Sequence, residues 1–174
     1  MNPATSKRHL DKSVPYPVQS VCDMAPEKAA FLSAHFSAIA HATEDAAKVE
    51  RAVRFLIGFM SRTEVSLSRQ YLKGHHGNVI TTISAKLPAK GLSPNALKLL
   101  SQKLPDSDRQ FLSSDMSSCI DEEGNLYLRF DKQEAFLGTV KLHQGDPIRI
   151  KLKFASEYDA EGIVKFCREN GLIL

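Results

Sequence analysis

The chain has 174 residues, of which 43% are hydrophobic, 25% charged and 7% aromatic, and its formal net charge is +3. These values predict a single compact domain and exclude a histone-like polycation, so any nucleic-acid signal must lie in the placement of the cations. The three cysteines are far apart and odd in number, which indicates unpaired thiols in a reducing cytosol and excludes a CxxC metal knuckle. No apolar run is long enough to span a bilayer, and we therefore expect a cytoplasmic protein.

Residues 1–30 contain four prolines and little apolar periodicity, so we expect a flexible arm outside a single domain of residues 31–174. From Ser33, apolar and polar residues alternate in the pattern of a strand that ends near Thr43. A helical repeat follows, with Gly58 as its expected end.

The rest of the chain reads as short strands and helices without regular alternation of the two. A pair of strands flanks the tight segment around Gly74 and Gly77, which predicts a hairpin. The expected elements are strands 65–73 and 79–87, helices 93–104 and 105–113, a short strand ending near Ile120, strand 126–130, a brief helix ending at Gly138, strands 139–143 and 148–154, and a last helix 159–169. This order predicts an α+β two-layer sandwich, a mainly antiparallel sheet with helices on one face and an open second face.

The open face is the first candidate site. In residues 148–154, four apolar residues alternate with three cations, so a strand there buries the apolar side and exposes the basic one. The same parity in the neighbouring strands predicts one outward set: Tyr127, Arg129, Lys141, His143, Arg149, Lys151 and Lys153. Such a face can neutralise several phosphates, although a merely solvated face is the common alternative in antiparallel sheets. Because aromatic residues are scarce, recognition of shape and phosphate is favoured over stacking.

The hairpin loop is the second candidate site. Backbone N–H groups beside glycines can approach a sugar-phosphate backbone closely. The residues assigned to RNA binding here are Arg69, Lys73, His75, His76, Gly77 and Asn78. The alternative is an ordinary turn with incidental histidines.

Catalysis has little support in the sequence. There is no Walker loop, GxSxG, HExxH or zinc spacing, so we expect no enzyme, no cofactor and no metal site. His35 and His41 share strand parity and could meet Asp45, but isolated histidines at a strand end are more often structural. Asp131 with Glu134 could hold a metal, although Asp131 is explained as a helix cap. A metal-dependent nuclease inactivated by Asp131→Ala is therefore a minor alternative.

Three segments together resemble a known family: AHFSAIAHATEDAAKVERAV from Ala34, KGHHGN from Lys73 and DEEGNLYLRFDKQEAFLG from Asp121. They are similar to the small archaeal RNA-binding proteins described as a predicted exosome subunit, from about Ser33 to the C-terminus. Where that family commonly has a proline after the loop asparagine, this chain has Val79.

The resemblance implies an α+β fold similar to that of a large-subunit ribosomal protein, structured RNA as the ligand, and a role in RNA processing or on the ribosome. It implies no established enzyme. We interpret the chain as a non-catalytic RNA-binding protein whose partners include exosome or ribosomal proteins. The alternative is a protein-interaction subunit that docks on an RNA-processing or ribosomal particle and contacts RNA only incidentally.

Overall fold

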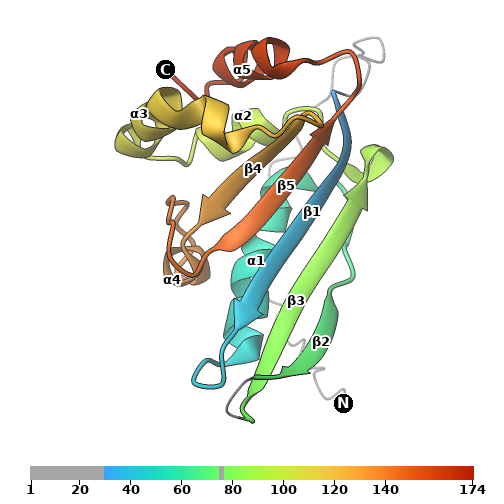
Figure 1. Cartoon of the computed structure of the whole chain (residues 1–174), viewed down its shortest axis with the longest axis vertical. Coiled ribbons are helices and arrows are strands. Elements are labelled where there is room, and N and C mark those ends of the chain that lie inside the picture. Colours follow the sequence, from blue (N-terminus) through green and yellow to red (C-terminus); the bar gives the residue numbers. More distant parts are fainter. Residues whose placement is uncertain (1–29, 75–76) are drawn as a thin grey trace, which may run out of the picture.

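The computed structural model of the protein describes residues 30–74 and 77–174. Five strands form one sheet in the order β2-β3-β1-β5-β4, and every neighbouring pair is antiparallel (Figure 1). The strands are β1 (Phe31–Ala40), β2 (Ser68–Lys73), β3 (Val79–Pro88), β4 (Asn125–Phe130) and β5 (Ile148–Phe154). The helices are α1 (Ala46–Met60), α2 (Ala96–Ser101), α3 (Asp106–Asp115), α4 (Lys132–Phe136) and α5 (Ala160–Glu169), with 3-10 turns η1 (Ala89–Gly91) and η2 (Met116–Cys119).

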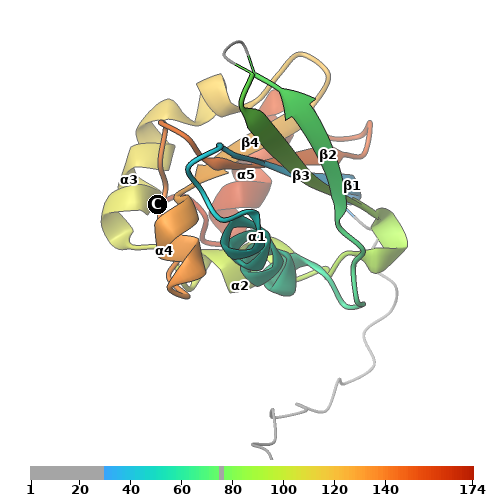
Figure 2. The same cartoon turned by 90° about the horizontal axis from the view of Figure 1, so that it is seen from below.

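The sheet has one apolar face, which packs on the helices. Cross-strand pairing places Phe36 beside Ile150 and Ile150 beside Leu128, and each of these side chains is at most 1% exposed. Helices α1, α2 and α4 lie beneath this face in Figure 2. The expected α+β architecture, with an antiparallel sheet and an open second face, is thus confirmed. The predicted inward parity of β4 and β5 is confirmed as well.

Helix α1 runs along the apolar face and contacts β1, β3, α2 and α4. Its first turn is capped by Asp45, whose carboxylate accepts the Ala47 N–H at 2.8 Å. The expected end at Gly58 is wrong, because the helix continues to Met60. Met60 is fully buried, and its burial outweighs the roughly 1 kcal/mol by which a helical glycine is disfavoured.

Two short strands expected from the sequence are only single bridges. Ile120 pairs with Leu126 after the 3-10 turn η2, and Leu142 pairs with Phe130. Around the second bridge, Asp131 N–H donates to the Lys141 carbonyl at 2.9 Å and His143 N–H donates to the Arg129 carbonyl at 3.1 Å. Residues 139–143 therefore lie along the outer edge of β4 and cover part of it. The other outer strand, β2, begins at Ser68 instead of Val65, and all six of its residues are exposed.

The predicted arm of residues 1–30 lies outside the described ranges, except for Ala30. Across the described ranges, every helix is too short or too polar to cross a lipid bilayer.

Candidate nucleic-acid interface

The face of the sheet opposite α1 carries a cluster of cations from β3, β5 and β4, with His35 of β1 between them. Pairing aligns Lys86 of β3 with His35 of β1, His35 with Lys151 of β5, and Lys151 with Tyr127 of β4. In the adjacent row, Arg149 lies opposite Arg129. We call this surface the basic face and define it as His35, Lys86, Tyr127, Arg129, Arg149, Lys151 and Lys153.

Five members of the basic face are exposed: His35, Lys86, Arg129, Arg149 and Lys153. Lys86, Arg149 and Lys153 form no ion pair with any carboxylate that the structure describes. Their charge is therefore available to an external anion. Several unpaired cations in adjacent rows on one face of the sheet create a positive potential that attracts polyanions.

Tyr127 and Lys151 are held in place at the centre of the cluster. The Tyr127 hydroxyl donates to Asp121 at 2.9 Å, and the Lys151 ammonium lies 5.3 Å from the centre of the Tyr127 ring. The contact with Tyr127 raises the pKa of Lys151, so this residue keeps its charge. The ring of Tyr127 is thus fixed before any ligand arrives.

Asp121 belongs to the acidic turn of residues 121–124 at one end of the basic face. Partial burial alone would raise the pKa of this carboxyl. Hydrogen bonds from Asn125, the Tyr127 hydroxyl and the Glu123 N–H outweigh that effect and lower the pKa to about 2. The turn is therefore a fixed negative border of the basic face.

The pKa of His35 reflects the positive potential of the basic face. Partial burial lowers the pKa of His35, and the neighbouring charges of Lys86 and Lys151 lower it further. The imidazole is therefore neutral at pH 7, because a third positive charge between two lysines is disfavoured.

Lys141 and His143 lie on the segment that covers the edge of β4. His143 pairs opposite Arg129 and is exposed, which extends the basic face past its outer strand. Its imidazole is 3.8 Å from the Asp131 carboxylate. Lys141 is exposed beside Asp131. Both residues thus lie at the margin of the cluster.

The parity of β2 places the hairpin cations Arg69 and Lys73 on the opposite side of the sheet from the basic face. Arg69 pairs with Ile83 and Lys73 with Val79, on the side of the sheet that faces α1. The Arg69 guanidinium bonds the Glu50 carboxylate of α1, and hydrogen bonds from Arg69 and then Arg54 lower the pKa of Glu50. Arg69 therefore already has an anionic partner within the protein.

At the tip of this hairpin, Gly77 has φ +78°, a backbone conformation that glycine adopts without strain. The Gly74 N–H donates to the Asn78 carbonyl at 2.7 Å and closes the turn. Lys73, Gly77 and Asn78 are exposed. His75 and His76, which the sequence analysis assigned to RNA binding, lie outside the described residues.

Sequence reasoning missed two members of the basic face, Lys86 and His35. The signal for Lys86 was present, because Ile83, Ala85 and Leu87 alternate with it in β3 in the same way that apolar residues alternate with cations in β5. His35 was considered only as a catalytic residue that shares strand parity with His41.

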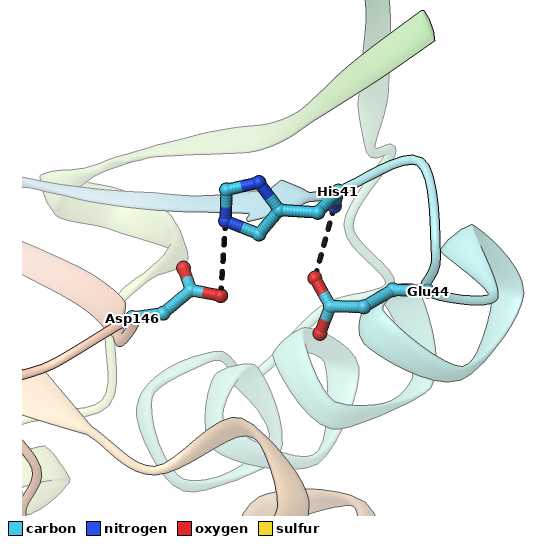
Figure 3. Close-up of side chains that lie close together, drawn as sticks. All are labelled: His41, Glu44 and Asp146. Atoms are coloured by element: carbon cyan, nitrogen blue, oxygen red, sulfur yellow. Dashed lines mark hydrogen bonds and ion pairs between the residues drawn. The ribbon is translucent and has the colours of Figure 1, made fainter. Parts of the chain in front are cut away.

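A second cluster of titratable side chains lies where β1 ends. His41, Glu44 and Asp146 have ligand atoms within 4.8 Å of one another, and Figure 3 shows the three side chains converging. The His41 imidazole is 3.2 Å from Asp146. The Lys132 ammonium, however, donates to Glu44 at 2.7 Å and also to Asp146. Because an internal cation already neutralises these carboxylates, the cluster holds segments together and is a poor metal site.

The other catalytic candidates are also occupied by structural roles. Asp131 caps α4 by accepting the N–H groups of Gln133 at 2.7 Å and Glu134 at 2.9 Å. His41 contacts Asp146, whereas Asp45 caps α1. Burial raises the pKa of the Cys167 thiol to about 12, which leaves it protonated and unreactive.

Comparisons with known proteins are consistent with this geometry. A model of a protein family described as RNA binding matches residues 33–154. The chain is 35% identical over 133 residues to the RNA-binding protein PAB1135 of Pyrococcus abyssi, an alignment that covers 74% of this chain and 86% of the relative. It is 33% identical over 120 residues to the uncharacterized protein MJ0213 of Methanocaldococcus jannaschii, covering 67% of this chain and 78% of that protein.

Solved structures share the fold. Protein AF2318 from Archaeoglobus fulgidus superimposes with a TM-score of 0.64 at 31% identity, over 80% of this chain and 99% of that one. Mth689 from Methanothermobacter thermautotrophicus superimposes with a TM-score of 0.61 at 27% identity, over 80% of this chain and 97% of that one. The matched family region, 33–154, includes every strand that carries the basic face.

Proposed function

We propose, from the premise that this chain belongs to the RNA-binding family matched over residues 33–154, that it binds structured RNA through the basic face and does not catalyse a reaction. The observation that carries the proposal is the register of the sheet, which aligns Lys86 of β3 with Lys151 of β5 on either side of His35, and Arg149 of β5 with Arg129 of β4. It brings cations that are far apart in sequence onto the face of the sheet opposite α1.

The lysines, the arginines and the tyrosine of the basic face are suited to different contacts with RNA. Lys86, Lys151 and Lys153 supply ammonium groups that contact phosphates as point charges. Arg129 and Arg149 supply planar guanidinium groups, which bind a phosphate or a base edge with two parallel hydrogen bonds. Tyr127 is an anchored ring on which a base can stack.

Structured RNA is the favoured form of ligand because the basic face is broad and nearly lacks aromatic side chains. A helical RNA presents phosphates and 2′-hydroxyls over a comparable area, whereas single strands bind best to rows of aromatic rings. Lys141 and His143 extend the same surface. The tip of the hairpin, with Lys73, Gly77 and Asn78 exposed and His75 and His76 beside them in sequence, is a second proposed contact.

The setting that we propose is RNA processing or the ribosome, in the cytoplasm, with exosome or ribosomal proteins as partners. The resemblance of the sequence to the predicted exosome subunits supports this part. Absence of catalysis is supported by the structural roles of Asp131 and of the cluster around Lys132.

The proposal is tested by measuring affinity for folded ribosomal RNA fragments over a series of salt concentrations. Each phosphate contact contributes about one unit to the slope of log K against log salt. We therefore expect the triple variant Arg149→Ala/Lys151→Ala/Lys153→Ala to bind more weakly, with a slope shallower by about 2 to 3.

A matched control removes three exposed lysines away from the basic face: Lys98→Ala/Lys103→Ala/Lys165→Ala. This variant loses the same net charge, so we expect only a small change in its slope. Equal effects of the two triple variants would refute a specific role for the basic face. Circular dichroism checks that both variants are folded. An intact protein without RNA affinity at low salt would refute direct binding altogether.

A further inference from the structure

The sheet contains a gap where β3 extends past its outer neighbour. Pairing between β2 and β3 stops at Ser68 and Ser84, yet β3 continues to Pro88. Beyond the last pair, residues 63–67 form no backbone hydrogen bond with residues 85–88 within the described chain. In Figure 1 the connection from α1 to β2 passes beside this upper part of β3.

The gap is closed again at its far end. Ser61 pairs with Leu92 in an isolated bridge, and Arg62 N–H donates to the Gly91 carbonyl at 3.1 Å. Between the two closures lies a pocket of about 400 Å³, within the range of small-molecule sites. Because backbone pairing closes the gap at both ends, an extended peptide strand cannot pass through it. A single compact chemical group can fit inside.

Both apolar side chains and cations line the pocket. It is lined by Glu64, Val65, Ser66, Lys86, Leu87, Pro88 and Lys90, together with Thr63 and Gly91. Alternate residues of β3 past Ser84 also direct backbone groups toward this side, where no strand of the described residues pairs with them. A flat heterocycle with hydrogen-bonding edges suits such a space, because it can pack on the apolar walls and pair with the backbone.

Lys86 connects the pocket to the basic face. It lines the pocket, and it lies opposite His35 in the row that leads to Lys151 and Tyr127. A polyanion on the basic face that contacts Lys86 therefore lies next to the pocket. Lys90, which is exposed in η1, is a second cation that lines the pocket.

We propose that this pocket receives a single unstacked base of the bound RNA while Lys86 and Lys90 hold the adjoining phosphates. Sequence-specific RNA recognition commonly uses splayed bases in this manner, and the Glu64 carboxylate can accept a hydrogen bond from a base amino or imino group. The inference rests on the proposed function and adds a preference for RNA with unpaired nucleotides.

Gly91 offers a direct way to fill the pocket. A Cβ added there lies 3.8 Å from Pro88 Cδ and 3.9 Å from Thr63 Oγ1, so it enters between two lining residues without a clash. Gly91→Leu should thus occupy the space that the base would take. Gly91→Ala is the matched control, since it changes the backbone equally and leaves most of the volume free.

The experiment compares two RNAs with the same number of phosphates, a hairpin with a single-stranded loop of mixed sequence and a fully paired duplex. Binding is measured by fluorescence anisotropy at one salt concentration. We expect the intact protein and Gly91→Ala to prefer the hairpin by about tenfold or more, as one stacked base contributes. Gly91→Leu should lose this preference and keep its affinity for the duplex.

A preference that survives in Gly91→Leu, or no preference in the intact protein, would overturn the inference while leaving RNA binding by the basic face intact. Failure of the intact protein to bind either RNA would overturn the proposed function itself. Should Gly91→Leu not fold, photo-crosslinking of the intact protein to hairpin RNA that carries 4-thiouridine in its loop decides the matter. Crosslinks within residues 63–66 or 86–91 support the pocket, and crosslinks confined to other peptides reject it.

Discussion

Replacing Lys132 by methionine should destabilise the fold more than the loss of any surface lysine. The Lys132 side chain is only 8% exposed, and its ammonium donates to the Ile39 carbonyl at 2.9 Å, to Glu44 at 2.7 Å and to Asp146. These contacts join the end of β1, the start of α4 and the turn before β5. Methionine preserves most of the apolar packing, so the change removes mainly the charge and its hydrogen bonds.

The expected cost follows from the exposure of the partners. Removing one member of a buried ion pair costs about 3–5 kcal/mol, whereas exposed pairs contribute at most about 1 kcal/mol. Here the ammonium is buried, but the side chains of Glu44 and Asp146 are 32% and 44% exposed, so water partly solvates the carboxylates that remain. We therefore expect Lys132→Met to lower the free energy of unfolding by about 2–3 kcal/mol.

Urea denaturation followed by circular dichroism measures this cost. The matched control is Lys165→Ala, which removes a lysine that is 77% exposed and 3.9 Å from Glu169, and should cost less than about 0.5 kcal/mol. Combining Lys132→Met with Glu44→Gln and Asp146→Asn should recover part of the loss, because the unpaired negative charges are gone. A cost for Lys132→Met no greater than that of Lys165→Ala would refute the reasoning.

Two further predictions concern titration. The folded pKa of Asp121, about 2, lies below its ordinary value of 3.8, so the carboxylate stabilises the fold above pH 3.8 and this contribution is lost as the pH falls toward 2. We therefore expect Asp121→Asn to lower the free energy of unfolding by about 1 kcal/mol at pH 7, after allowance for the partial exposure of Asp121. The stability of the variant should also change less than that of the intact protein between pH 3.8 and pH 2. Acid titrations of both proteins test this expectation. His35 should titrate below 6.5 in an NMR pH series, and its pKa should rise in Lys86→Met and also on RNA binding, since each change reduces the positive potential around the imidazole. An unchanged His35 midpoint in Lys86→Met would mean that the charge of Lys86 does not contribute to the lowered pKa of His35.

The outward-facing residues of a strand could be predicted from the sequence where apolar and polar residues alternate strongly. In β5 the four apolar positions must be buried, and a slip of one residue would place Arg149 and Lys153 in the core, so parity follows from hydrophobicity and charge alone. In β2 all six residues are exposed, and no apolar face sets the parity. The position of Arg69 on the side of α1 could therefore not be derived.

What the sequence could not predict depends on contacts between distant segments. The strand order places β3 beside β1, which is how Lys86 comes next to His35, and nothing local to either residue specifies that pairing. Lys132 and its partner Glu44 are likewise 88 positions apart in the chain. The pocket beside β3 arises where two strands separate, an event that only the assembled register reveals.

The two outer strands of the sheet differ in a way that governs how copies of this protein can meet. Residues 139–143 cover part of the outer edge of β4, so that edge offers few free backbone groups to another chain. Among the described residues no strand pairs with the outer edge of β2, whose Tyr71 and Leu72 are 67% and 55% exposed. In the described part of the chain, sheet extension between molecules, whether in a dimer or in an aggregate, is thus easier along β2 than along β4, and the charge of the exposed Lys73 opposes uncontrolled growth there.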